Sequence, residues 1–177
     1  SLATKGLVVI SGEVRTKADI DTAKIVKKTI EEIGYNKDNS GVDPSDIEVL
    51  SKLHAQSPEI AQGIDSEDLA SQGAGDQGLM FGYACKETPE LMPLPIQISH
   101  RLTEKLTELR KSGDMEWLRP DGKSQVSVLY ENGSPVSIEK TVIATQHDDM
   151  IEKYGSESNE LKFVESEVIN YVIKPVL

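Results

Sequence analysis

The chain has 177 residues, enough for one domain or two small ones, and its 37% hydrophobic and 28% charged residues are ordinary for a globular protein. Its net charge of −11 argues against non-specific binding to nucleic acid or to an anionic membrane. Cys85 is the only cysteine, which excludes an intrachain disulfide and favours a reducing compartment. With no apolar run as long as a membrane helix, we expect a cytoplasmic protein with no nucleic acid and no membrane among its partners.

The first segment predicts a strand, a helix and a second strand. The apolar centre of residues 5–14 is typical of a strand covered on both faces, and Glu13 follows at its exit, where a glutamate is usually solvated. Residues 19–33 predict a helix, with Asp19 as N-cap and Gly34 as C-cap. Its apolar face consists of Ala23, Val26, Ile30 and Ile33. The second strand is marked by Ile47, Val49 and Leu53. This order begins a two-layer α/β unit.

Residues 55–69 are irregular, and two interpretations stay open: an exposed connector or a mobile lid over a site. The following sequence, S-Q-G-A-G-D-Q-G-L-M-F-G-Y (71–83), places Asp76 and Gln77 among three glycines. An acid and an amide on such a ribbon could bind a small polar ligand, whereas a tight turn capped by Asp76 before a buried strand (78–84) is the alternative. We expect Cys85 to fill the core.

The second segment predicts a helix, a hairpin and a last helix. A proline-rich stretch leads into a helix at about residues 96–111, whose buried face is Ile98, Leu102, Leu106 and Leu109. A loop over 117–123 is followed by a strand over 124–130, with Val126, Val128 and Tyr130 inward, and Asn132-Gly133 predicts the hairpin turn. The return strand, 136–145, presents Val136, Ile138, Val142 and Ala144 on one face. The last helix is capped by Ser158, ended by Pro175 and buried through Leu161, Val164, Val168 and Val172.

Charged residues crowd the loop before the hairpin. Arg119, Asp121 and Lys123 lie within five residues, so Lys123 is either a ligand-binding cation or a charge at a strand edge. His54, His100 and His147 are isolated, with no second histidine or cysteine at ligand spacing. We therefore assign no metal site to histidine.

Several motifs together resemble those of S-adenosylmethionine synthetases (methionine adenosyltransferases). The signature is G-A-G-D-Q-G-L-M-F-G-Y, and W-L-R-P-D-G-K-S-Q-V is similar to the family's W-L-R-P-D-x-K-S/T-Q-V. Further similar stretches, in family order, are G-L-V-V-I-S-G-E-V, H-A-Q-S-P-E-I-A-Q-G-I, L-M-P-L-P-I-Q-I-S-H-R-L and T-Q-H. The resemblance implies a fold of the α/β (α+β) type: two-layer β-α-β units with mixed sheets that pack face to face in a dimer.

The resemblance implies that the methionine sulfur attacks C5′ of ATP, and that the triphosphate is cleaved to pyrophosphate and phosphate. Two Mg²⁺ ions and one K⁺ ion would serve the phosphates. Glu13, Gln56 and Asp76 would bind methionine, with Asp76 at the ammonium group. Asp121 would hold the ribose of ATP, with Gly122 beside it, and Lys123 would neutralise the phosphates as the catalytic cation. The flexible loop, 56–66, would include Gln56, Ser57, Pro58, Gln62, Gly63 and Asp65.

The resemblance also implies a homo-oligomer, a dimer or a dimer of dimers, with each site between two subunits. Residues 1–66 would be the latter part of the N-terminal domain and 67–177 the central domain. The family's early His-Pro-Asp-Lys segment, which supplies a phosphate-binding histidine and a Mg²⁺-binding aspartate, does not occur in this sequence. We therefore expect a partial chain with little activity alone. The alternative function is a non-catalytic α/β module that dimerises or binds a nucleotide.

Overall fold

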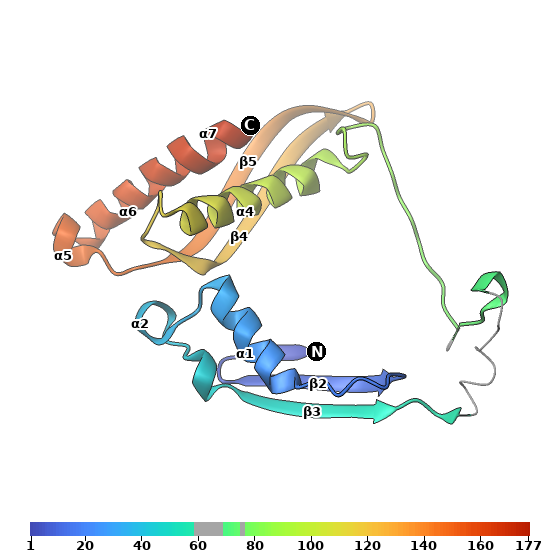
Figure 1. The fold of residues 1–177 in the computed structure, drawn as a ribbon. Coiled ribbons are helices and arrows are strands. Elements are labelled where there is room, and N and C mark those ends of the chain that lie inside the picture. Colours follow the sequence, from blue (N-terminus) through green and yellow to red (C-terminus); the bar gives the residue numbers. More distant parts are fainter. Residues whose placement is uncertain (59–68, 75–76) are drawn as a thin grey trace. The chain divides into compact units, whose positions relative to one another are not determined.

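The computed structural model describes residues 1–58, 69–74 and 77–177, which form two compact units, 1–82 and 83–177 (Figure 1). The predicted domain boundary after residue 66 lies outside the described residues and stays a prediction. Among the described residues, no helix combines the length and apolar character that crossing a membrane requires.

The first unit is built on a three-stranded sheet with the order β1-β2-β3. Strand β1 (Leu2–Thr4) is antiparallel to β2 (Leu7–Val14), and β2 is parallel to β3 (Glu48–Ala55). Helix α1 (Thr22–Ile33) connects the parallel pair, followed by a short helix, α2 (Lys37–Ser40), and a 3-10 turn, η1 (Pro44–Asp46). A second 3-10 turn, η2, spans Leu69–Ser71. The predicted strand–helix–strand order is confirmed.

The N-cap of helix α1 lies two residues after the predicted one. Asp21, not Asp19, is the cap, because its carboxylate accepts the Lys24 backbone N–H at 2.9 Å and so satisfies one of the free amides of the first turn. Gly34 is the C-cap as predicted, at φ 109°. The predicted apolar face is only partly correct. Ala23, Val26 and Ile30 are half-buried, and Ile33 is exposed.

Within the described part of this unit, β2 is not covered on both faces, so the predicted second cover stays a prediction. Only Val8 of that strand is buried, while Leu7, Val9 and Ile10 are half-buried. Helix α1 is the only long helix between β2 and β3, and one layer of helix can cover only one face of a sheet. An apolar strand centre therefore does not by itself reveal whether one chain supplies both covers.

The predicted strand over 78–84 is not formed. Its described residues are neither helical nor in a sheet, and Leu79, Met80 and Phe81 are 80%, 91% and 92% exposed. A strand needs a neighbour for its backbone N–H and C=O groups, and no described residue pairs with this segment. The prediction of a core position for Cys85 is also wrong, because Cys85 is half-buried and outside any strand.

The second unit packs helices against a long two-stranded hairpin (Figure 1). Helix α4 (Leu94–Ser112) precedes the antiparallel strands β4 (Leu118–Glu131) and β5 (Ser134–His147). The predicted turn is confirmed: Asn132 and Gly133 both have positive φ, 51° and 77°, as a tight hairpin turn requires. The loop predicted over 117–123 is wrong from residue 118 onward, because β4 begins there and Gly122 and Lys123 already pair with Thr145 and Ala144.

The chain ends in consecutive helical segments: α5 (Ile151–Tyr154), α6 (Glu157–Glu167), a π-helical turn η3 (Val168–Ile173) and α7 (Lys174–Val176). Ser156, not Ser158, caps α6, since its hydroxyl accepts the Asn159 N–H. Pro175 does not end the helix. It lies inside the continuous helical run, between Lys174 and Val176 of α7.

The core of the second unit lies between α4, the hairpin and the last helices. The predicted face of α4 is confirmed, since Ile98, Leu102, Leu106 and Leu109 are all buried. Val126, Val168 and Val172 are buried and Val164 is packed against the core, whereas Leu161 is 55% exposed, against the prediction. Leu102, Met115, Leu118 and Val172 are the most deeply buried side chains.

The two faces of the hairpin differ. The half-buried side chains of β5 that face α4 include Thr141, Ile143 and Thr145. The opposite face, which we call the outer face, carries Val142 and Ala144. The residues predicted on one face of β5, Val136, Ile138, Val142 and Ala144, are all exposed, as is Tyr130, which was predicted inward. Val128, also predicted inward, is half-buried against the core.

Candidate functional site

Strand β4 places Asp121 and Lys123 on its outer face and Gly122 toward α4, since successive residues of a strand point to opposite sides. The Lys123 ammonium lies 3.3 Å from both carboxylate oxygens of Asp121. Both side chains are open to solvent, 73% and 56% exposed. The structure therefore brings together an acid and a base that a ligand can reach without displacing any other side chain.

At Gly122, β4 lies close against α4. A Cβ atom at this position would lie 3.3 Å from the Leu106 Cδ1 atom and 3.9 Å from the Thr145 Oγ1 atom. The first distance is tighter than ordinary van der Waals contact, and Leu106 is buried in the core. The absent side chain thus allows β4 to lie against α4, and this fixes the backbone that carries Asp121 and Lys123.

Arg119 does not join these two residues. Its guanidinium forms a two-point ion pair with Asp148, with 2.6 Å between Arg119 Nε and one carboxylate oxygen, and donates to the carbonyls of Glu116 and Leu118. The side chain is only 16% exposed. Arg119 therefore holds the beginning of β4 to the segment after β5, and Asp148 is the partner that sequence reasoning missed.

In the first unit, Glu13 and Gln56 lie at the carboxyl ends of two neighbouring parallel strands. Glu13 is paired in register with His54, and the Gln56 N–H donates to the Val14 carbonyl at 3.2 Å. Glu13 is exposed and Gln56 is half-buried, and Ser57 and Pro58 follow directly. The carboxyl ends of parallel strands are the usual place for a binding site in α/β units. The predicted residues Gln62, Gly63, Asp65 and Asp76 lie outside the described residues.

Both units match models of one protein family. Residues 1–58 match the N-terminal domain of S-adenosylmethionine synthetase, and residues 71–177 match its central domain. The chain belongs to the S-adenosylmethionine synthetase family. The resemblance read from the motifs is thereby confirmed, and the two mixed α/β units agree with the fold that it implied. The family consists of methionine adenosyltransferases, which are transferases.

S-adenosylmethionine synthetases are generally metal-dependent, so the described residues must be tested for a donor set. Among them, no group of three or more histidine, cysteine, aspartate or glutamate side chains could hold a metal ion. His147 packs edge-on against Trp117, and its Nδ1 atom lies 2.7 Å from the Asp148 carbonyl oxygen. The described residues therefore contain no cluster of these side-chain types that could hold a metal ion by itself.

A second polar cluster in this synthetase chain was not predicted. Glu87 accepts the Leu94 N–H at 2.8 Å and the Tyr130 hydroxyl at 2.6 Å. The Leu94 amide, followed by the Tyr130 hydroxyl, lowers the pKa of Glu87, and the bond to Glu87 raises the pKa of Tyr130 to about 12. These two hydrogen bonds of Glu87, which we call the Glu87 clamp, join the start of α4 to the tip of the hairpin. Glu87 and Tyr130 are far apart in sequence, so no local pattern indicates the pair.

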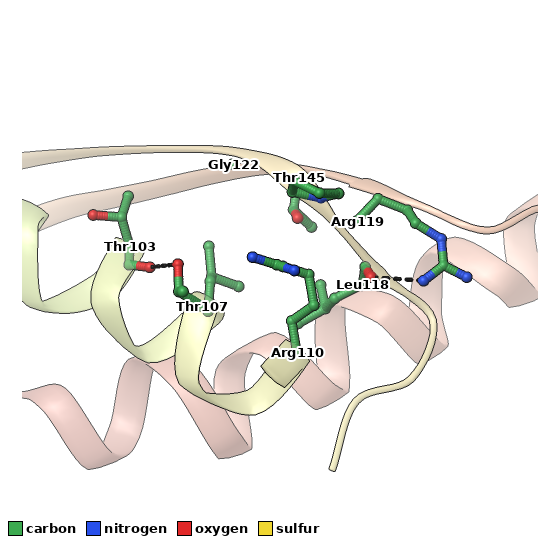
Figure 2. A pocket seen from close by; sticks show the side chains of 9 residues that line it. Thr103, Thr107, Arg110, Leu118, Arg119, Gly122 and Thr145 are labelled. Carbon is green, nitrogen blue, oxygen red and sulfur yellow. Dashed lines mark hydrogen bonds between the residues drawn. The ribbon is translucent and has the colours of Figure 1, made fainter. Parts of the chain in front are cut away.

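The central-domain unit also contains a small pocket with polar and apolar walls where α4 lies against the hairpin (Figure 2). Its volume is about 50 Å³, and Gly122 and Thr145 form its strand side. Thr103, Thr107 and Arg110 line it from α4 at helical spacing, a pattern that the sequence carried but that we did not interpret.

Proposed function

We propose that this chain carries the methionine- and ribose-binding part of an S-adenosylmethionine synthetase. The reaction joins ATP to L-methionine and cleaves the displaced triphosphate to pyrophosphate and phosphate. The observation that carries this proposal is the family match over residues 1–58 and 71–177. It is supported by the exposed pair of Asp121 and Lys123, an acid and a base of the types that a ribose and a phosphate chain need.

In the proposed reaction, a lone pair of the methionine sulfur forms a bond to C5′ of ATP. The bond from C5′ to the triphosphate oxygen breaks, and its electrons stay with the triphosphate. Lys123 would bind the phosphate chain and stabilise the charge that develops on it, while Asp121 would accept hydrogen bonds from the ribose hydroxyls. Because their own ion pair is exposed, exchanging it for substrate contacts costs little.

The methionine side of the site would come from the first unit. Glu13 and Gln56 would approach methionine from the carboxyl ends of β2 and β3, and Asp76 would bind its ammonium group. Gln56 would begin the lid, 56–66, that closes over the substrates. The domain division is proposed as 1–66 and 67–177, and the compartment as the cytoplasm.

We further propose a homo-oligomer, a dimer or a dimer of dimers, with each site between subunits. The exposed apolar residues Val136, Ile138 and Val142 support this, because a sheet face of this kind is a candidate interface. The proposal keeps Mg²⁺ (two) and K⁺ as cofactors of the family, and their ligands are not assigned to described residues. Their role, when bound, is to neutralise the phosphates.

The decisive test is S-adenosylmethionine formation from ATP, methionine, Mg²⁺ and K⁺. The assay is run on the protein as its organism makes it and on the 177-residue chain. We expect product from the first and little or none from the second. If the natural protein forms no product but still binds ATP or dimerises, the alternative function, a non-catalytic module, is supported instead.

The role of Lys123 is tested in the active protein with Lys123→Gln. We expect kcat to fall by roughly 100-fold or more, since one charge-stabilising donor is lost from the transition state. Lys140→Gln is the matched control, because Lys140 is also an exposed lysine of the hairpin and lies on β5. Equal activity of both variants would contradict the assignment of Lys123.

A further inference from the structure

The pocket between α4 and the hairpin contains a cation without a partner. Arg110 is half-buried in its wall, and within the described part of the chain it forms no hydrogen bond or ion pair. The chain has 30 acidic and only 19 basic residues, so acidic partners outnumber cations. Arg110 nevertheless has no acidic partner among the described residues. None of the residues that line the pocket is acidic.

The other lining groups are compatible with an anion. Arg119 also lies in the wall, but Asp148 neutralises its charge, so Arg110 supplies the uncompensated positive charge. Thr107 donates its hydroxyl to the Thr103 carbonyl at 3.0 Å, and Thr145 donates to the Gln146 carbonyl over a longer 3.3 Å. The Thr145 hydroxyl is therefore the donor that a ligand could redirect most easily. In Figure 2 the Arg110 side chain extends from α4 into the space beside Gly122 and Thr145.

The size of the pocket limits the ligand. Its volume of about 50 Å³ is several times the ~10–15 Å³ that one water molecule needs, but it is far below the ~300 Å³ at which pockets for drug-sized ligands begin. A nucleotide is excluded, whereas one small oxyanion can enter. An arginine fork with neighbouring hydroxyls is suited to such a group.

We propose that this pocket binds a small oxyanion, with Arg110 as the main ligand and Thr145 as a second donor. The site is distinct from Asp121 and Lys123, because those side chains leave the opposite face of β4. The proposal does not depend on the synthetase activity. The alternative role for Arg110 is electrostatic, since it lies in the last turn of α4, where a cation stabilises the helix end.

The experiment is a titration of the ¹⁵N-labelled 177-residue chain with inorganic phosphate at constant ionic strength. Binding is monitored through the amide chemical shifts. We expect saturable shifts at Gly122, Thr107 and Thr145. Arg110→Gln should weaken phosphate binding at least about tenfold, because a charge-assisted hydrogen bond is lost, and Thr145→Val should weaken it less. Acetate, titrated in the same way, distinguishes a planar carboxylate from a tetrahedral anion.

Two controls separate this site from the alternatives. Lys111→Gln removes the neighbouring charge of the same helix end, so it should destabilise the helix similarly but leave phosphate binding unchanged. Arg110→Lys keeps the charge and should bind phosphate with intermediate affinity. Shifts that do not saturate, that centre on Lys123, or that persist in Arg110→Gln would each overturn the proposal.

Discussion

Gly122 lies against Leu106 and pairs with Thr145, and its neighbours in sequence carry the two proposed ATP-binding side chains. We predict that Gly122→Val lowers the free energy of unfolding by about 1–3 kcal/mol, since the new methyl groups overpack the contact with α4. Urea denaturation measures this. Gly122→Ala should cost less, because only the far end of the Leu106 side chain must move. A valine variant as stable as the wild type would show that β4 and α4 separate freely.

Leu102 tests the core at the same scale. It is completely buried on α4, so Leu102→Ala should cost about 2–5 kcal/mol of unfolding free energy. Leu161→Ala is the matched control, because Leu161 is 55% exposed on α6 and its truncation should change stability by only ~0.5 kcal/mol or less. Similar losses in the two variants would mean that α6 buries Leu161 against something in solution.

At the scale of elements, the clamp of Glu87 joins α4 to the hairpin in a way that depends on pH. The pKa of Glu87 is lowered, so its contribution to stability is present above its ordinary pKa of 4.5 and is lost as the pH falls through the lowered value. The pKa of Tyr130 is raised from 10.0 to about 12, so its contribution is present below pH 10 and is lost as the pH rises through about 12.

Tyr130→Phe tests this clamp. We predict that the variant has a lower Tm than the wild type between these limits, and that the difference in Tm shrinks below pH 4.5 as Glu87 takes up a proton. Thermal unfolding followed by circular dichroism across this pH range gives the difference directly. A Tm difference that is constant down to acid pH would show that the hydrogen bond from the Tyr130 hydroxyl to Glu87 does not account for the lost stability.

At the scale of the whole molecule, the two units have unequal cores. Of the buried hydrophobic residues in the described part of the chain, only Val8 and Ile47 belong to the first unit, and all the others belong to the second. We predict that backbone amides of α4 and β4 exchange with deuterium far more slowly than those of β2 and α1. Hydrogen exchange read by mass spectrometry measures this, and equal protection in both units would contradict it.

Local signals predicted the elements well where one chain supplies both partners of a contact. The buried face of α4 followed from the spacing of its leucines, and the Asn132-Gly133 turn from its dihedral demands. The failures have one physical origin, which is that a pattern shows where apolar side chains gather but not what covers them. Residues 78–84 were predicted as a buried strand, and apolar residues of β5 were predicted to share one face, yet the described residues leave both exposed.

The candidate site, too, was predicted only in part from the sequence. Motif resemblance predicted Asp121 and Lys123, and the structure places them together, while it adds the pairing of Arg119 with Asp148. That pairing joins residues 29 positions apart, so no spacing rule could find it. The position of Arg110 in a pocket was missed because it depends on how closely α4 and β4 approach each other, which the absent side chain of Gly122 allows.

Side chains of β4 alternate between its two faces, and this alternation limits how the length of the strand can change. Lys123 and the pocket beside Gly122 share one stretch of backbone and use its opposite sides. Pairing with β5 is regular from Gly122 to Ser127, so inserting or deleting a single residue just before Lys123 would turn the lysine toward the leucines of α4. A change of two residues would preserve the alternation. Viable length variants of this strand should therefore differ by even numbers of residues, or carry a bulge that restores the parity.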